Sequence, residues 1–172
     1  MVYILMGVAG SGKTAVGRMI AERIGYAFHD ADDFHSAGNI EKMRSGVPLG
    51  DGDRGGWLLD LALHVAQWNR SGGAVLACSA LKDSYRAILS WNGREETAFI
   101  YLKVSPEVAR ERLRKRTGHF FPPELIEAQF MDLEEPAGAV AVDASGTPDR
   151  VCGAVIEELV RRGLFKREIA DV

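Results

Sequence analysis

Cysteine is scarce in this chain of 172 residues, in which Cys78 and Cys152 are the only two. Two cysteines are too few for a disulfide framework and too few for a four-cysteine zinc site. Long hydrophobic runs are also missing, and none approaches the roughly 20 residues that a membrane-spanning helix needs. The apolar stretch at the N-terminus is too short for a signal peptide and fits a first strand. We therefore expect a cytoplasmic protein without a membrane partner.

An excess of charge of one sign is missing as well. The chain has 21 Lys and Arg against 24 Asp and Glu, a formal net charge of -3. This balance gives no general attraction to nucleic acid, so no nucleic-acid partner is expected. No repeat, linker or low-complexity segment interrupts the sequence, and its length is sufficient for one hydrophobic core. We expect a single domain over residues 1–172.

What the sequence does contain is a phosphate-binding loop near its start. Residues 7–14 fill every fixed position of the pattern G-x-x-x-x-G-K-[S/T]. Its glycines allow backbone N–H groups to curl around phosphate oxygens. The lysine can bridge the β- and γ-phosphates, and the threonine hydroxyl can bind Mg²⁺. The residues predicted to bind a nucleoside triphosphate are Gly7, Val8, Ala9, Gly10, Ser11, Gly12, Lys13 and Thr14.

Apolar strands and amphipathic helices alternate along the chain. Strands are expected at residues 2–6, 26–29, 74–78, 97–102 and 139–142. Helices are expected after the phosphate loop as far as Gly25, over 57–68, from Pro106, and from Pro148 to about Arg162. This alternation predicts an α/β fold of three layers, a five-stranded parallel sheet with helices on both faces. Active residues should then lie at the carboxyl ends of the strands.

Acidic residues follow the second expected strand. Asp30 and Asp32 lie two positions apart at the end of this strand. Their carboxylates can bind Mg²⁺, through water, and a hydroxyl of the substrate. The alternative is a solvated turn or a helix cap, but the nearby phosphate loop favours a functional role. The next segment, residues 39–54, is rich in Gly, Pro and Asp and predicts a long ordered loop, which is often functional. Residues 53–56 have the spacing of the D-x-x-G of GTPases, but the chain has no N-K-x-D guanine motif.

Basic residues occur at two later places. Lys82 and Arg86 follow the third strand, where an anionic substrate group would lie, although they can equally be surface charges of a helix. Five of the seven residues 110–116 are basic, and Arg112 and Arg116 share a helical face. One short basic turn in an acidic protein is a poor nucleic-acid surface. We instead predict a short lid at about 112–123, whose arginines close over the triphosphate.

Together these segments resemble the P-loop type of gluconate kinase, in the group of small-molecule kinases that includes adenylate and shikimate kinases. The resemblance runs from Val2 to about Leu159. Besides the phosphate loop it is carried by N-I-E-K-M at 39–43, P-L-x-D-x-D-R at 48–54 and G-H-F at 118–120. It implies ATP-dependent phosphorylation of D-gluconate to 6-phosphogluconate by a homodimer.

The resemblance also implies a role for each polar residue of the site. Lys13, Thr14 and Asp30 would hold the triphosphate with its Mg²⁺, and Asp32 would orient or deprotonate the sugar hydroxyl. Arg112 or Arg116 would act from the lid. The sugar-acid pocket would be lined by Asp32, His35, Arg54, Lys82, Arg86 and His119. The chain departs from the family pattern at Gly50, Gly52, Gly56 and Ala128. The family often has proline at the position of Gly56, and glycine there would loosen the expected loop because it gives the unfolded chain more conformational freedom.

Two other functions are compatible with the phosphate loop. One is a kinase for another small acid such as shikimate, against which the specific segment 39–54 argues. The other is a nucleotide-binding regulatory module, which would need no acceptor pocket. The polar residues on the expected acceptor side, His35, Arg54, Lys82 and Arg86, argue against this module. Residues 142–148 can cradle the adenine base, but they do not define which base is bound.

Overall fold

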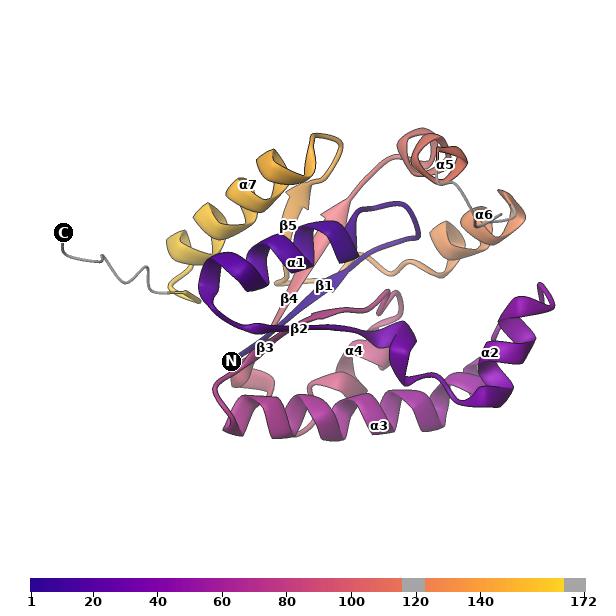
Figure 1. Ribbon diagram of the computed structural model, residues 1–172, viewed down its shortest axis with the longest axis horizontal. Coiled ribbons are helices and arrows are strands. Elements are labelled where there is room, and N and C mark those ends of the chain that lie inside the picture. The colour runs from indigo at the N-terminus through magenta and orange to yellow at the C-terminus, as the bar shows by residue number, and fades with distance from the viewer. Residues whose placement is uncertain (116–122, 166–172) are drawn as a thin grey trace.

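A parallel β-sheet forms the centre of the protein in the computed structural model, which describes residues 1–115 and 123–165 (Figure 1). Its five strands lie in the order β2-β3-β1-β4-β5, and every neighbouring pair is parallel. The strands are β1 (Val2–Met6), β2 (Ala27–Asp30), β3 (Ala74–Ala77), β4 (Thr97–Lys103) and β5 (Val140–Asp143). All five correspond to predicted strands. Because they run in one direction, the loops that follow them meet at one edge of the sheet.

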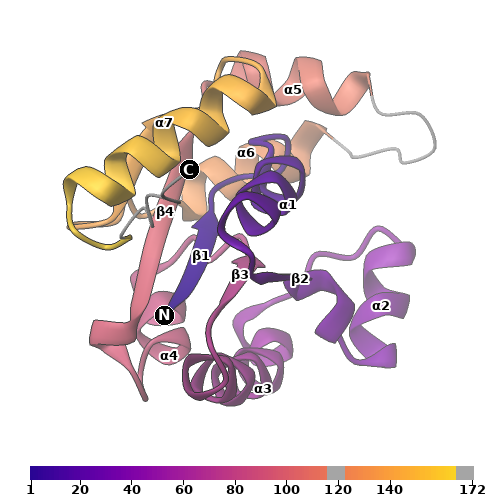
Figure 2. The same cartoon turned by 60° about the vertical axis from the view of Figure 1, so that its left-hand side comes forward.

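Helices cover both faces of the sheet, as predicted (Figures 1 and 2). One face carries α1 (Lys13–Ile24) and α7 (Pro148–Arg161), and the other carries α3 (Asp51–Arg70) and α4 (Asp83–Leu89). Three further helices lie beyond the carboxyl edge of the strands: α2 (Ala37–Arg44), α5 (Pro106–Arg114) and α6 (Pro123–Asp132). No helix in the described ranges is both long and apolar enough to cross a membrane.

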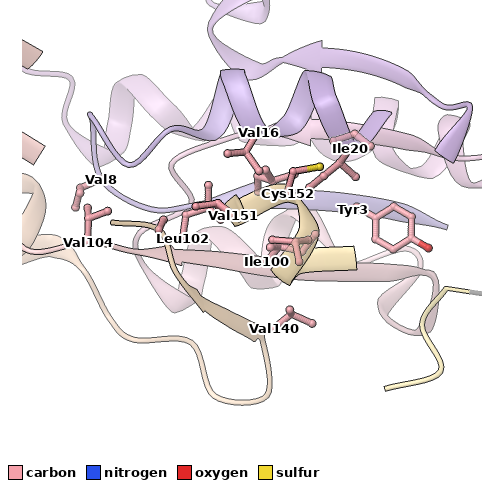
Figure 3. Packing of buried hydrophobic residues seen from close by; sticks show 14 of the residues in the cluster. Tyr3, Val8, Val16, Ile20, Ile100, Leu102, Val104, Val140, Val151 and Cys152 are labelled. Carbon is pink, nitrogen blue, oxygen red and sulfur yellow. The ribbon is translucent and has the colours of Figure 1, made fainter. Parts of the chain in front are cut away.

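The alternation of side chains along β1 builds a separate core on each face. Tyr3 and Leu5 belong to the cluster under α1 and α7, while Ile4 and Met6 belong to the cluster under α3 and α4. Figure 3 shows the first cluster, in which side chains of β1, β4 and β5 meet residues of α1 and α7. All five residues of β1 are buried, which explains why the strand reads as one continuous apolar run. Cys152 belongs to the first cluster and Cys78 to the second, and neither forms a disulfide.

Several helix ends were readable from the sequence. Gly25 ends α1 with φ 71°, and Ser105 begins α5 by accepting a hydrogen bond from the backbone N–H of Val108 at 3.3 Å. Pro106 and Pro148 occupy the first turns of α5 and α7, as expected.

The prediction of a long loop over residues 39–54 was wrong. Most of this segment lies in α2 and in the first turn of α3. Ser36 caps α2 by accepting from the N–H of Asn39 at 3.2 Å, and the carboxylate of Asp53 closes the first turn of α3 on the N–H of Gly50 at 3.0 Å. These local hydrogen bonds and the burial of later α3 residues outweigh the low helix propensity of glycine. Gly56 therefore lies inside a helix rather than in a loop.

The predicted lid at 112–123 is described only at its two ends. Residues 112–114 form the last turn of α5, in agreement with the helical face predicted for Arg112, and α6 begins at Pro123. Arg116 and His119, which were predicted to act from this segment, lie outside the described residues.

Candidate active site

The phosphate loop joins β1 to α1 at the carboxyl edge of the sheet. Gly7, Gly10 and Gly12 have positive φ angles of 138°, 79° and 100°. A Cβ atom on Gly10 would lie 2.7 Å from the carbonyl oxygen of Ala109, which shows how closely the loop approaches α5. Only glycine fits these positions without strain, so the loop has the backbone that the motif predicts.

Lys13 and Thr14 follow at the start of α1. The ammonium group of Lys13 donates to the carbonyl oxygens of Gly7 at 2.9 Å and Val8 at 3.0 Å. The hydroxyl of Thr14 donates to one carboxylate oxygen of Asp30, at the end of β2, at 2.9 Å. A hydroxyl beside a carboxylate is a donor set that suits Mg²⁺, an ion that takes one or two carboxylates plus waters and phosphate oxygens. The described ranges hold no cluster of three or more His, Cys, Asp and Glu for a metal bound by the protein alone.

Two helices that flank the predicted lid hold the phosphate loop from outside. Arg112 of α5 donates to the carbonyl oxygens of Gly10 and Ser11, both at 3.4 Å. The same guanidinium donates to two carbonyls that follow β5, those of Ala144 at 2.7 Å and Gly146 at 2.9 Å. It thus joins the loop to the segment 142–148 that was considered for the adenine base. The role of Arg112 in catalysis stays a prediction.

Gln129 of α6 makes the second attachment. Its side-chain oxygen accepts a hydrogen bond from the backbone N–H of Ala9 at 2.6 Å, across 120 residues of sequence. No role was predicted for Gln129, because no local sequence pattern connects it with the loop.

The acidic turn after β2 is a short 3₁₀ helix, Ala31–Phe34. Asp30 caps it by accepting from the N–H of Asp32 at 3.2 Å. Desolvation by the surrounding protein, and then repulsion from Asp30, raise the pKa of Asp32, although water still reaches 84% of its side chain. A raised pKa makes this carboxylate a stronger base while leaving it accessible to an acceptor.

His35 lies directly behind this turn. Its side chain is only 3% exposed, and its Nε2 atom lies 3.8 Å from the carboxylate of Asp32. Burial lowers the pKa of His35, the neighbouring Asp32 raises it and Arg54 lowers it, with a net decrease. The imidazole is therefore neutral near pH 7. Its ring stacks on the indole of Trp57, with centroids 4.3 Å apart and planes inclined by 16°.

Arg54 lies in the first turns of α3, and its Nε–H donates to the carbonyl of Leu49 at 3.3 Å. The residue before it, Asp53, accepts from Lys42 at 2.5 Å, and its carbonyl accepts from the side chain of Asn39 at 2.9 Å. Helix α2 is thereby fixed to the start of α3. The N-I-E-K-M and P-L-x-D-x-D-R segments thus form one unit around Arg54, a contact that spacing alone did not predict.

The segments that carry the site meet at the end of β3. Cys78, the residue after this strand, is buried, and burial raises the pKa of its thiol to about 12. Hydrogen bonds join the surrounding segments here: the N–H of Gly7 in the phosphate loop donates to the carbonyl of Ser79 at 3.1 Å, and the indole of Trp57 donates to the carbonyl of Ala31 in the acidic turn at 2.9 Å. Trp57 and Arg54 belong to the same helix, so the phosphate loop, the acidic turn and the start of α3 meet at this edge, as the strand-end rule predicts.

Lys82 and Arg86 are already engaged with other groups. Lys82 donates to Asp51 at 3.0 Å and lies 3.8 Å from Asp132. Arg86 is buried and donates to the carbonyls of Ala80 at 3.0 Å and Leu81 at 2.8 Å, so it stabilises the loop after β3. Ala80 has φ 42°, a conformation that such hydrogen bonds help to maintain. The predicted binding roles of Lys82 and Arg86 stay predictions.

A parallel five-stranded sheet with a phosphate loop after its central strand, and with acidic and basic groups on the acceptor side, defines a P-loop kinase of small molecules. The sequence model of the family described as shikimate kinase matches residues 9–129. Individual proteins that match the chain at about 40% identity are gluconokinases. A probable gluconokinase of Dictyostelium discoideum is 44% identical over 142 residues, 79% of this chain and 71% of that protein.

Two further relatives cover nearly the whole chain. The thermoresistant gluconokinase of Escherichia coli (strain K12) is 40% identical over 169 residues, 94% of each protein. The crystal structure of a gluconokinase from Sinorhizobium meliloti 1021 superposes with a TM-score of 0.87 at 40% identity, covering 94% of this chain and 92% of that one. The chain belongs to the gluconokinase family, which confirms the resemblance found in the sequence.

Proposed function

We propose that this protein transfers the γ-phosphoryl group of ATP to the primary hydroxyl of D-gluconate, giving 6-phospho-D-gluconate and ADP. The supporting observation is that the phosphate loop after β1 and the acidic turn after β2 both lie at the carboxyl edge of the sheet, where Thr14 donates to Asp30 at 2.9 Å. The turn also contacts the helix that carries Arg54, because His35, 3.8 Å from Asp32, stacks on Trp57 of α3. The similarity to proteins named gluconokinase supports the choice of acceptor. The unit formed by α2 and the start of α3, which contains segment 39–54, favours gluconate over shikimate.

The donor side is built by the phosphate loop. Its backbone N–H groups and the N-terminus of α1 would bind the phosphates, and Lys13 would move from the loop carbonyls to the β- and γ-phosphates. Thr14 and Asp30 are the residues that would hold Mg²⁺. When bound, this ion supplies positive charge that neutralises the phosphate oxygens.

The acceptor side needs a cation at one end and a base at the other. Arg54 would bind the carboxylate of gluconate through two parallel hydrogen bonds. Asp32 would accept the proton of the primary hydroxyl as its oxygen attacks the γ-phosphorus and the bond to ADP breaks. His35, Lys82, Arg86 and His119 would line the pocket between these two ends.

The same proposal covers the domain, the lid, the location and the oligomeric state. Residues 1–172 act as one kinase domain, and Arg112 or Arg116 stabilises the transferred phosphoryl group when the lid closes. The enzyme is a cytoplasmic homodimer that needs neither nucleic acid nor a membrane. The motifs shared with P-loop gluconate kinases are the reason to expect the homodimer and the lid arginine.

An assay of ADP release over a panel of acids tests the activity. Purified protein with ATP and Mg²⁺ should release ADP with D-gluconate and show at most background rates with shikimate and with nucleoside monophosphates. Turnover of shikimate without turnover of gluconate would contradict the proposal. Slow ADP release that no acceptor accelerates would favour the regulatory module.

A further inference from the structure

Trp57 is a buried residue of the acceptor side to which neither the motifs nor the proposed reaction gives a role. It lies in α3, one helical turn after Arg54, and its residue is only 6% exposed. Its indole Nε1–H donates to the carbonyl oxygen of Ala31 at 2.9 Å, a buried hydrogen bond between residues 26 positions apart. This carbonyl belongs to the residue immediately before Asp32.

The face of the same indole supports the other end of the acidic turn. The imidazole of His35 stacks on it at 4.3 Å, and the Nε2 atom of His35 lies 3.8 Å from the Asp32 carboxylate. Trp57 therefore contacts the chain before Asp32 by a hydrogen bond and the chain after it by ring stacking.

Asp32 depends on these contacts because no core packing holds its side chain. The side chain is 84% exposed, so the position of its carboxylate follows the backbone that carries it. The cap from Asp30 fixes the N–H of Asp32, and the contacts of Trp57 fix the residues on either side. A shift of the turn against α3 would move the carboxylate directly.

The position of Trp57 in α3 gives these contacts a further consequence. Arg54 and Trp57 are i, i+3 neighbours and lie on the same side of one helix. A single rigid element thus carries the cation for the acceptor's carboxylate and the side chain that fixes the base for its hydroxyl. The distance between the two ends of the acceptor site is set through this helix.

We propose that Trp57 is a positioning residue that fixes the separation of Asp32 and Arg54 and so selects acceptor acids by chain length. The inference rests on the proposed function, because it takes Asp32 and Arg54 as the two ends of the gluconate site. An acid one carbon shorter or longer than gluconate presents its terminal hydroxyl at the wrong distance from the base. A misplacement of about 1 Å between reacting groups can cost about 10²-fold in rate.

The test compares Trp57→Phe with Trp91→Phe. The first substitution keeps an aromatic ring for His35 but removes the hydrogen bond to Ala31, whereas Trp91 is 68% exposed and remote from the site, and serves as the matched control. Trp57→Leu removes both contacts. For each protein, kcat and KM are measured with D-gluconate and with the five- and seven-carbon aldonates at saturating ATP, and KM for ATP is measured with gluconate.

We expect Trp57→Phe to lower kcat with gluconate about 10-fold and to leave KM for ATP within about twofold. The preference for gluconate over the other two acids, taken as a ratio of kcat/KM values, should fall at least 10-fold, and Trp57→Leu should reduce it further. Trp91→Phe should behave as wild type. The ratio is decisive because partial unfolding lowers the active fraction equally for every acceptor.

Two results separate this inference from the proposed function. If wild-type enzyme phosphorylates gluconate and Trp57→Phe keeps the wild-type ratio, the inference is wrong whatever happens to the rate, and the proposed function stands. If wild-type enzyme phosphorylates none of the three acids, the proposed function is wrong and the inference falls with it. Should Trp57→Leu fail to fold, Trp57→Phe alone decides.

Discussion

Replacement of Arg54 by lysine tests how the site recognises the acceptor. Arg54 is half-buried, and its Nε–H donates to the carbonyl of Leu49 at 3.3 Å. The two terminal nitrogens of this side chain can then make parallel hydrogen bonds to a carboxylate, which the single ammonium group of lysine cannot copy. The charge is kept, so the substitution removes geometry rather than attraction.

The size of the effect follows from one lost charge-assisted hydrogen bond. Such bonds contribute about 1.5–3 kcal/mol, which corresponds to roughly 10- to 150-fold in affinity. Because Arg54 is only half-buried, we expect an effect at the lower end of this range, a rise of about 10-fold in KM for gluconate. KM for ATP should stay within about twofold, since the hydrogen bonds of Arg54 among the described residues go to Leu49 and Gly50 and none goes to the phosphate loop.

The assay is steady-state kinetics with gluconate varied at saturating ATP, and then with ATP varied at saturating gluconate. Arg70→Lys is the matched control, because Arg70 is the exposed last residue of the same helix. An unchanged KM for gluconate in Arg54→Lys would refute the assignment of Arg54 to the carboxylate. An equal rise in both KM values would show that the substitution disturbs the whole site.

Three other substitutions test separate parts of the structure. Asp32→Asn should lower kcat by about 10²–10⁴-fold with little change in KM for gluconate, because an amide cannot accept the hydroxyl proton; a rise in KM alone would contradict this. Gln129→Met leaves the N–H of Ala9 without its partner, at a cost of about 1–3 kcal/mol. This substitution should raise KM for ATP by roughly 5-fold or more, whereas Gln67→Met, the control at an exposed position, should leave KM for ATP unchanged. Hydrogen bonds from Arg161 and Arg162 hold the pKa of Glu158 at about 2, below its ordinary 4.5, so its stabilising effect is full above pH 4.5 and is lost as the pH falls towards 2. Glu158→Gln should therefore give a slightly lower Tm at pH 7 and the wild-type Tm near pH 2, and equal Tm values at pH 7 would contradict this account.

The sheet and the phosphate loop were predictable because local sequence determines them. β1 is buried on both faces and therefore reads as an unbroken apolar run, and the glycines of the loop are required by its backbone angles. Family segments then predicted Arg54 and Asp32 as acceptor residues, and in the structure Asp32 lies in the turn after β2 and Arg54 in the first turn of α3.

Other parts of the site depend on contacts between distant segments. Segment 39–54 looked like a loop because its glycines and proline suggest one, while the contacts that make it helical join Asp53 to α2 and bury Trp57. Arg86 was expected in the pocket because it is a basic residue after a strand. Its guanidinium instead donates to the carbonyl of Ala80, which the path of the loop with φ 42° at Ala80 brings within reach. No periodicity in a sequence reports such contacts.

The identity of the product shows which group receives the phosphoryl group of ATP. Purified protein, ATP, Mg²⁺ and D-gluconate are combined with an excess of an NADP⁺-dependent 6-phosphogluconate dehydrogenase, so that NADPH forms only when the phosphate is on the terminal carbon. We expect one NADPH for each ADP released, at a rate that depends on gluconate and that Asp32→Asn lowers by about 10²-fold or more. Release of ADP without NADPH would show that the phosphoryl group goes elsewhere, and would contradict the assignment of Asp32 and Arg54 to the two ends of gluconate.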